Sequence, residues 1–220
     1  MELTPLDPAG VPLGTVVLLH GFTRHPRDLQ APAERFAALG ARVLRPRLGA
    51  WWWPRSTNRT RYLTHIAEAV AQARSTGPLI VVGHSAGAPA GAWIAAALRN
   101  SGTSVDALIL VDGVESPAKT LRRAWPDLTG VPVDVICAPP SRCNRNGALA
   151  RWLDDYRESG QPGPSVDVIV IPGMGHGDVE GPGRNVYVRW CHDDPAAPAL
   201  AELEGTLDGL VERALDAVAK

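Results

Sequence analysis

Short apolar runs rich in β-branched residues recur along the 220-residue chain and alternate with amphipathic segments. Strands of a parallel sheet are buried on both faces, so they read as continuous apolar runs rather than as an alternation. The pattern predicts strands at 15–19, 41–44, 79–82, 107–111, 133–137 and 166–171. Such runs, separated by helix-length segments, predict a three-layer α/β fold with a mostly parallel sheet of about six strands and helices on both faces.

The segments between these runs carry apolar residues at steps of three and four, the spacing of one helix face. The stripes are Leu29, Phe36 and Leu39; Tyr62, Ile66 and Val70; and Leu149, Trp152, Leu153 and Tyr156. A last helix is predicted from about 198 to 219. Gly40 and Gly160 stand where C-terminal caps belong, and Ser116 with Pro117 is typical of an N-cap followed by proline. No repeat or linker divides the chain, so we expect a single domain over residues 1–220.

The charge balance argues against nucleic acid as a binding partner. The chain has 22 lysines and arginines against 23 acidic residues, whereas nucleic-acid-binding domains usually carry a basic excess. The first residues lack a secretory signal pattern, and no apolar run approaches the ~20 residues that span a bilayer. Cys137, Cys143 and Cys191 form no CxxC pair, so we expect reduced thiols. The prediction is a soluble, cytoplasmic protein without a membrane span.

The stretch LIVVGHSAGAPAGAWIAAAL carries the clearest chemical signal. A buried strand runs into Gly83-His84-Ser85-Ala86-Gly87, and an alanine-rich helix begins at once. In a nucleophile elbow the serine sits on a sharp strand-to-helix turn, which requires small flanking residues and exposes its hydroxyl. The helix N-terminus behind it favours developing negative charge. A Gly/Ser turn that only caps a helix is the alternative, but the position between strand and helix favours a nucleophile.

From these residues the chain resembles the α/β-hydrolase family. The turn His20-Gly21-Phe22 after the first predicted parallel strand is similar to the family's HG-x turn. The resemblance implies that the backbone N–H groups of Phe22 and Ala86 form an oxyanion hole. A final strand followed by the Gly-rich turn holding His176 matches the place of the family's general base. The order of serine before histidine also fits the family.

The chain departs from the larger members of that family. About fourteen residues precede the first predicted parallel strand, so the usual N-terminal antiparallel strands must be missing or reduced. Residues 112–131 leave room for one short helix only, so we expect no lid domain. The resemblance is therefore to small lidless esterases and thioesterases. Ser85 at the elbow also separates the chain from branches with an aspartate nucleophile.

The acid partner of His176 is less clear from the sequence. The family's commonest position lies in the loop that here reads CAPPSRCNRNG, which contains Asn144 but no carboxylate. Asp112, at the end of the preceding strand, occupies the alternative acid position of some lipases, although an aspartate there is often structural. An asparagine could orient the imidazole but not offset its charge. Asp112 is the first choice and Asn144 the second; Asp178, Glu115 or a Ser-His dyad remain open.

The other histidines and the cysteines give no metal site. His20 and His84 flank motif residues in buried turns, where packing or hydrogen bonding is the simpler role. No HxxxH or HxH pair occurs, so we expect neither a metal nor a cofactor. Cys143 and Cys191 fall in loops on the same expected face and could be neighbours.

Three adjacent tryptophans, Trp51, Trp52 and Trp53, follow a predicted strand. Loops at the carboxyl ends of parallel strands form the ligand crevice of α/β sheets. We expect one or two of these side chains to line a substrate pocket near Ser85, together with Asn144; packing of all three in the core is the alternative. Nearby arginines, among them Arg24, are expected on a solvated rim that would also suit an anionic substrate.

The resulting hypothesis is a serine hydrolase for an ester or thioester with a bulky apolar or aromatic acyl part. Ser85 would be the nucleophile, His176 the base and Asp112 the acid. The substrate would be a small molecule, either free or bound to a carrier. Another reaction on the same fold, by a cyclase, lyase or acyltransferase, is the main alternative, and a non-catalytic binding module is a third.

Overall fold

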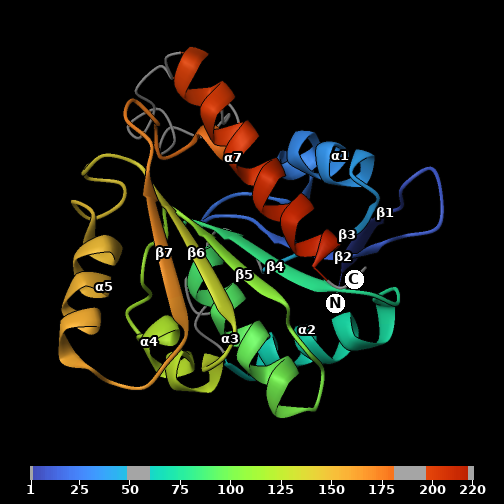
Figure 1. Ribbon diagram of the computed structural model, residues 1–220, viewed down its shortest axis with the longest axis horizontal. Coiled ribbons are helices and arrows are strands. Elements are labelled where there is room, and N and C mark those ends of the chain that lie inside the picture. Colours follow the sequence, from blue (N-terminus) through green and yellow to red (C-terminus); the bar gives the residue numbers. More distant parts are fainter. Residues whose placement is uncertain (1, 49–59, 181–196, 218–220) are drawn as a thin grey trace.

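A seven-stranded sheet forms the centre of the computed structural model, which describes residues 2–48, 60–180 and 197–217 (Figure 1). The strands are β1 (Leu3–Leu6), β2 (Gly14–Leu19), β3 (Ala41–Pro46), β4 (Leu79–His84), β5 (Ala107–Val111), β6 (Pro132–Cys137) and β7 (Ser165–Val170). Their order is β1-β3-β2-β4-β5-β6-β7. Only β1 runs antiparallel to its neighbour among the described strands. All six predicted strands are confirmed, and β1 is the reduced antiparallel strand at one edge.

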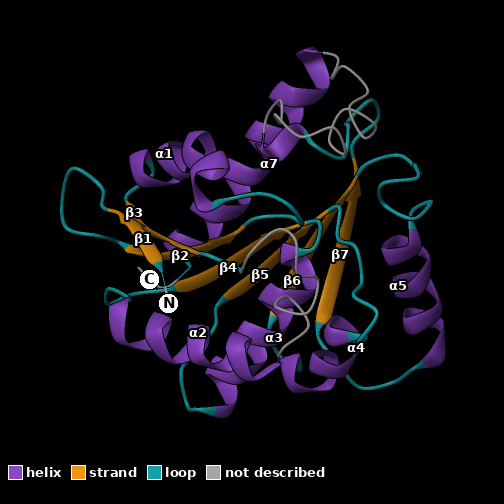
Figure 2. Cartoon of the chain, turned by 180° about the vertical axis from the view of Figure 1, so that it is seen from behind, coloured by secondary structure: helices purple, strands orange, loops and turns teal. Residues whose placement is uncertain are grey.

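Helices cover both faces of the sheet (Figures 1 and 2). One layer contains α1 (Gln30–Ala38) and α7 (Ala197–Asp216), and the other contains α2 (Thr60–Ala73), α3 (Gly87–Asn100), α4 (Thr120–Ala124) and α5 (Ala148–Ser159). Short 3₁₀ turns lie at η1 (Pro26–Leu29), η2 (Trp125–Leu128) and η3 (Asp178–Glu180). The predicted three-layer architecture is confirmed. Residues 112–131 form α4 and η2, and no lid is inserted there.

Alternate residues of each central strand enter opposite halves of the core. In β2, Val16 and Leu18 pack in the cluster that includes α1 and α7, whereas Val17 and Leu19 pack in the cluster with α2 and α3. All four side chains are at most 1% exposed. Burial on both faces explains why the sequence is continuously apolar here. Because β2 to β7 run parallel, their carboxyl ends lie at one edge of the sheet, where the loops with candidate chemistry begin.

The caps agree with the sequence at two places and differ at a third. Gly40 and Gly160 have φ angles of 92° and 65° and follow α1 and α5, as predicted. The N-cap predicted at Ser116 is wrong, because α4 begins only at Thr120. Ser116 Oγ nevertheless accepts from the Thr120 N–H at 3.2 Å, and the Glu115 carboxylate accepts from the next two N–H groups of α4, at 3.2 and 3.0 Å. The last helix likewise ends earlier than predicted, at Asp216.

Candidate active site

Ser85 lies on a sharp turn between β4 and α3. Its φ is 52°, in the left-handed region that side chains other than glycine rarely adopt. The turn is held by the Ser85 N–H, which donates to the Val111 oxygen at 3.0 Å on the neighbouring strand. Ala86 is the N-cap residue of α3. The hydroxyl therefore stands at the carboxyl edge of the sheet, beside the positive end of a helix.

Close backbone contacts explain the two glycines of the motif. A Cβ on Gly83 would lie 2.4 Å from the Gly87 oxygen, and a Cβ on Gly87 would lie 2.5 Å from the Leu19 oxygen. Both clashes are with backbone, which cannot rotate away. The close packing of β2, β4 and α3 therefore leaves no room for a side chain at either glycine.

Replacing Gly87 by alanine is expected to destabilise the fold by about 1–3 kcal/mol, because the added methyl overlaps the Leu19 carbonyl. The loss appears as a lower urea midpoint with an unchanged slope. Gly209→Ala is the matched control: Gly209 is an exposed residue inside α7 with nothing within 4 Å of an added Cβ. That variant should be neutral or gain up to about 1 kcal/mol from helix propensity. Equal effects at the two positions would contradict the tight turn.

His176 and Asp112 complete a chain of polar contacts from Ser85. His176 Nε2 lies 2.9 Å from Ser85 Oγ, and its Nδ1 lies 2.5 Å from Asp112 Oδ2. A carboxylate accepts only, so Nδ1 carries the proton and Nε2 is free to accept from the hydroxyl. The Asp112 side chain is 4% exposed and the His176 side chain 11%. The structure brings the three residues together in the order hydroxyl, imidazole, carboxylate.

The second oxygen of Asp112 is also occupied. Asp112 Oδ1 accepts from the Ala138 N–H at 3.1 Å and from Asn144 Nδ2 at 3.2 Å. Asp112 itself has a φ of 42°, and its N–H donates to the Ile136 oxygen at 2.7 Å. These contacts fix the carboxylate from the side opposite His176.

Asn144 was predicted as a substrate contact or as a substitute for the acid. It is 2% exposed, and its side-chain oxygen accepts from the N–H groups of Ser141 and Gly147, each at 2.8 Å. Its amide also donates to the Pro139 oxygen at 2.9 Å. Asn144 thus lies behind Asp112, with its amide group used by the loop and by the carboxylate.

The remaining candidate acids have local roles. Glu115 caps α4, and Asp178 Oδ2 accepts from the Gly175 N–H at 2.7 Å in the loop of His176. Asp112 Oδ2, by contrast, contacts the imidazole of His176 directly, at 2.5 Å. Among the described carboxylates, the geometry therefore favours Asp112 as the partner of His176.

The turn that follows β2 packs directly against Ser85. A Cβ on Gly21 would lie 3.1 Å from the Ser85 Cβ. The next residue, Phe22, is 46% exposed, which is unusual for a large apolar side chain. The backbone N–H groups of Phe22 and Ala86 donate to no other described backbone group outside the regular elements. The turn that contains Phe22 and the turn that contains Ser85 and Ala86 thus lie side by side at the carboxyl edge of the sheet.

A buried ionic group, which the sequence did not predict, lies next to Ser85. Glu180, with a 1% exposed side chain, contacts Arg24 Nε at 2.9 Å and His84 Nδ1 at 2.9 Å. Its Oε1 also accepts from the Gly21 N–H at 2.5 Å. The Arg24 side chain is only 7% exposed, so its expected place on a solvated rim is wrong. Glu180 lies four residues after His176 and Arg24 three after Gly21, but neither spacing indicates that the two side chains pair.

Two predictions from the sequence fall partly or wholly outside the described residues. Trp51, Trp52 and Trp53 lie there, and so does Cys191. Cys143 is disulfide-bonded, so the prediction of reduced thiols is wrong for this residue. Cys137 is free and buried at the end of β6, and burial raises the pKa of its thiol to about 12.

Among the helices of the described residues, none has the length and apolar character needed to span a membrane.

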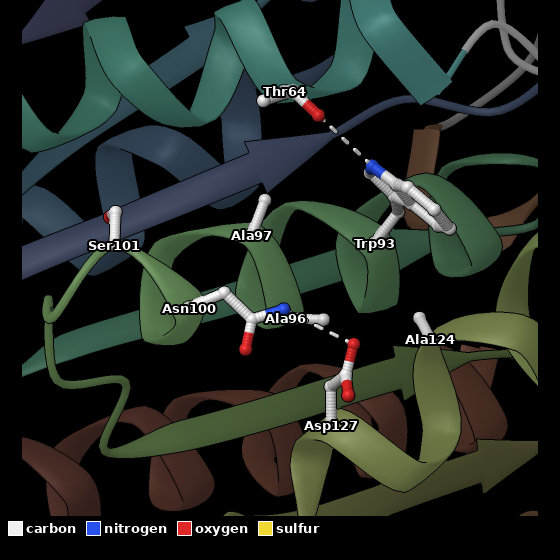
Figure 3. A pocket seen from close by; sticks show the side chains of 8 residues that line it. All are labelled: Thr64, Trp93, Ala96, Ala97, Asn100, Ser101, Ala124 and Asp127. Atoms are coloured by element: carbon white, nitrogen blue, oxygen red, sulfur yellow. Dashed lines mark hydrogen bonds between the residues drawn. The ribbon is translucent and has the colours of Figure 1, made fainter.

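A separate groove of ≈ 360 Å³ follows the C-terminal half of α3, between α2 and the α4–η2 segment (Figure 3). Trp93 forms one wall, and its Nε1 donates to Thr64 Oγ1 at 3.3 Å. Asn100 donates to Asp127 at 3.2 Å on the other side. Ser85 precedes the opposite end of the same helix, so this groove is not part of the site around the serine.

Solved structures with the same arrangement of elements belong to hydrolases. Est1E from Butyrivibrio proteoclasticus matches with a TM-score of 0.66 at 16% identity, over 97% of this chain and 94% of that one. An alpha-beta serine hydrolase homologue from Coxiella burnetii matches with 0.63 at 15% identity, over 96% and 89%. Alpha/beta hydrolase domain-containing protein 10 from mouse matches with 0.63 at 15% identity, over 96% and 93%. No protein-family model and no curated protein matches the sequence.

Proposed function

We propose that this chain, which has the α/β-hydrolase fold, is a serine hydrolase that cleaves an ester or thioester bond. The observation that carries the proposal is the contact chain from Ser85 through His176 to Asp112, with distances of 2.9 and 2.5 Å. It starts at a serine on a strained strand-to-helix turn, which is the arrangement of an activated nucleophile, its base and the group that orients the base. Structural neighbours that include esterases support the same class of reaction.

Acylation follows from the protonation states in the site. Ser85 Oγ attacks the substrate carbonyl as His176 Nε2 takes the hydroxyl proton. The imidazolium that forms is stabilised by Asp112, which has no proton to give and keeps Nδ1–H in place. Negative charge develops on the carbonyl oxygen, and the N–H groups of Phe22 and Ala86 donate to it. His176 then returns the proton to the leaving alcohol or thiol.

Deacylation uses the same groups in reverse. Water donates its proton to His176 Nε2 and attacks the acyl carbonyl, and the N–H groups of Phe22 and Ala86 again stabilise the oxyanion. Collapse releases the carboxylic acid and restores the Ser85 hydroxyl. Each step transfers one proton through Nε2, and the contact of Nδ1 with Asp112 is preserved throughout.

A bulky apolar or aromatic acyl part is the proposed specificity. Phe22, exposed beside the serine, supplies apolar surface at the edge of the site. The loop that contains Trp51, Trp52 and Trp53 follows β3, a neighbour of β2 in the sheet, so its start lies at the same carboxyl edge. An aromatic acyl group packed on an indole gains about 0.5–1.5 kcal/mol beyond the burial of its area.

The first experiment uses four substrates. Two are the p-nitrophenyl esters of acetic acid and of a naphthoic acid, and two are thioesters of the same acids. The expected result is measurable release of acid from all four, with a higher kcat/KM for the naphthoyl compounds. Absence of hydrolysis with every compound, in a folded preparation, would point to the cyclase, lyase or acyltransferase alternative. A preference for acetate would refute the proposed acyl class.

The tryptophans are tested with the same pair of esters. At least one of Trp51→Ala, Trp52→Ala and Trp53→Ala is expected to lower kcat/KM for the naphthoyl ester by about tenfold, which corresponds to ~1.4 kcal/mol, and to spare the acetate. A tryptophan that serves only the core would instead lower the melting temperature and reduce both activities together. Three variants with an unchanged ratio of the two activities would show that the tryptophans do not select the acyl group.

A further inference from the structure

A buried set of charged side chains connects the three segments that form the candidate site. Glu180 comes from η3, which follows the loop of His176, and its carboxylate binds the Gly21 N–H next to the proposed oxyanion residue. His84, the residue before Ser85, contacts both Glu180 and the backbone oxygen of His176. The His84 side chain is 3% exposed. The nucleophile turn, the base loop and the oxyanion turn are therefore joined through one imidazole and one carboxylate.

Both ring nitrogens of His84 face acceptors. Nε2 lies 2.6 Å from the His176 carbonyl oxygen, and Nδ1 lies 2.9 Å from Glu180 Oε1. Neither oxygen has a proton to donate, because Glu180 already accepts from the Gly21 N–H and pairs with Arg24. A neutral imidazole has one N–H, so one nitrogen would then present its lone pair to an oxygen. Nε2–H donates to the His176 oxygen, whereas Nδ1 lies 2.9 Å from Glu180 Oε1 at ion-pair distance but outside hydrogen-bond geometry. A proton on Nδ1 turns this close approach of a lone pair to a carboxylate into an ion pair, so the contacts favour an imidazolium.

His20, a buried histidine in the same region, shows the opposite pattern. Its Nδ1 donates to the Gly21 oxygen at 2.9 Å, while its Nε2 accepts from the Leu48 N–H at 3.1 Å. One donor and one acceptor suit a neutral ring, and burial lowers the pKa of His20. The two histidines differ in the groups around them rather than in depth, since both are at most 3% exposed.

The charges around His84 favour the same assignment. Burial acts to lower the pKa of His84, but Glu180, the His176 carbonyl and Asp112 outweigh it and raise that pKa above its ordinary value. Burial acts to raise the pKa of Glu180, yet His84, the Gly21 N–H and Arg24 hold it below its ordinary value. A buried carboxylate between two cations is better compensated than an isolated pair.

We propose that His84 acts as a buried imidazolium that positions the catalytic base: it donates from Nε2 to the His176 backbone oxygen, is held by Glu180, and so fixes the base loop and the oxyanion turn relative to Ser85. This inference rests on the proposed serine hydrolase function. His84 touches neither the substrate nor the reacting atoms, so it is a positioning residue. An error of about 1 Å in the place of a catalytic group can reduce the rate by ~10²-fold, which makes such a support consequential.

A pH dependence follows from the sign of the shift. Because the pKa of His84 is raised on folding, its contribution to stability is fully present below the ordinary value and is lost as the pH rises through the raised value. The groups that face His84 are Glu180 from η3, His176 from its loop and Asp112 from the end of β5. Arg24 and His20 in turn face Glu180. The stability carried by His84 is therefore lost on the alkaline side.

Nitrogen NMR of the histidine-labelled wild-type chain tests the protonation state without reference to activity. One of the six histidines is expected to keep both ring nitrogens protonated well above the ordinary histidine pKa of ~6.5. That signal should disappear in His84→Gln and shift to a neutral pattern in Glu180→Gln. If every histidine of the wild-type chain is neutral at this pH, the proposal is wrong, whether or not the variants fold.

Kinetics test the positioning role. His84→Gln and Glu180→Gln are each expected to lower kcat for an ester by about 10- to 100-fold with KM changed far less, because geometry at the reacting atoms is lost and not substrate binding. The double variant should lose much less than the product of the single losses, since both changes disrupt one connection. His65→Gln controls for loss of a histidine, and Ile66→Val, a buried change on α2, controls for loss of stability. Both controls should keep the wild-type kcat.

The outcomes separate the inference from the function on which it rests. Wild-type protein without ester hydrolysis would refute the function, while the NMR result would still decide the charge of His84. An active wild type whose His84→Gln and Glu180→Gln variants keep kcat would refute the positioning role alone. A fall in kcat matched by Ile66→Val at equal loss of melting temperature would also overturn it, since the effect would then be general destabilisation.

Discussion

Ser85→Ala is expected to lower kcat for a p-nitrophenyl ester by about 10⁴- to 10⁶-fold, the range seen when a triad nucleophile is removed. Without Oγ no acyl-enzyme forms, and only general stabilisation by the oxyanion N–H groups remains. KM should change little, because the hydroxyl is a small part of the binding surface. Initial rates with the acetate ester at several substrate concentrations give both constants.

The fold should tolerate that substitution. Alanine removes one buried oxygen at a residue with 7% exposure, and its backbone must take the same left-handed φ that serine takes. Circular dichroism and the melting temperature of Ser85→Ala serve as the control. Residual activity within tenfold of the wild type, in a folded variant, would be incompatible with a nucleophilic Ser85.

Asp112→Asn is the second large effect, with kcat expected to fall by about 10⁴-fold. The asparagine amide can turn its NH₂ group towards His176 Nδ1, which then accepts a hydrogen bond. The ring proton would move to Nε2, and Nε2 could no longer accept the proton of the Ser85 hydroxyl. The carboxylate charge that stabilises the imidazolium is lost as well. The shape of the residue is nearly unchanged, so the loss should appear in kcat with a folded protein.

Asn144→Ala is the matched comparison for the acid. It removes one of two described donors to Asp112 Oδ1, while the Ala138 N–H remains at 3.1 Å. We expect a fall in kcat of about tenfold, close to the value of one lost hydrogen bond to a charged group. If Asn144→Ala lowers kcat more than Asp112→Asn does, the assignment is reversed and the asparagine is the group that orients His176.

The sheet could be predicted from the sequence because each parallel strand is buried on both faces and leaves a continuous apolar run. The strand β1 escaped prediction, since LTPL is four residues long, only partly buried and contains proline. Pairing with β3 at the sheet edge decides its conformation, and that contact is non-local. Helix starts were also uncertain: Glu115 reaches six and seven residues ahead to cap α4, which no local rule anticipates.

The candidate site, like the fold, could be predicted from the sequence only in part. Ser85, His176 and the Gly21 turn could be recognised because tight backbone geometry restricts the residue types around them. Choosing between Asp112 and Asn144 required coordinates, because both follow strands at one sheet edge and differ only in which contacts the imidazole. The links from Glu180 to Arg24 and Gly21 span more than 150 positions in the sequence, and no spacing within the chain indicates them.

Labelling with a fluorophosphonate tests most directly the central claim that Ser85 is an activated nucleophile. Intact-mass spectrometry of the wild-type chain should show one added phosphonyl group, peptide mapping should locate it on Ser85, and Ser85→Ala should remain unlabelled. A wild-type protein that stays unmodified while a control esterase reacts completely, or an adduct mapped to another residue, would contradict the account.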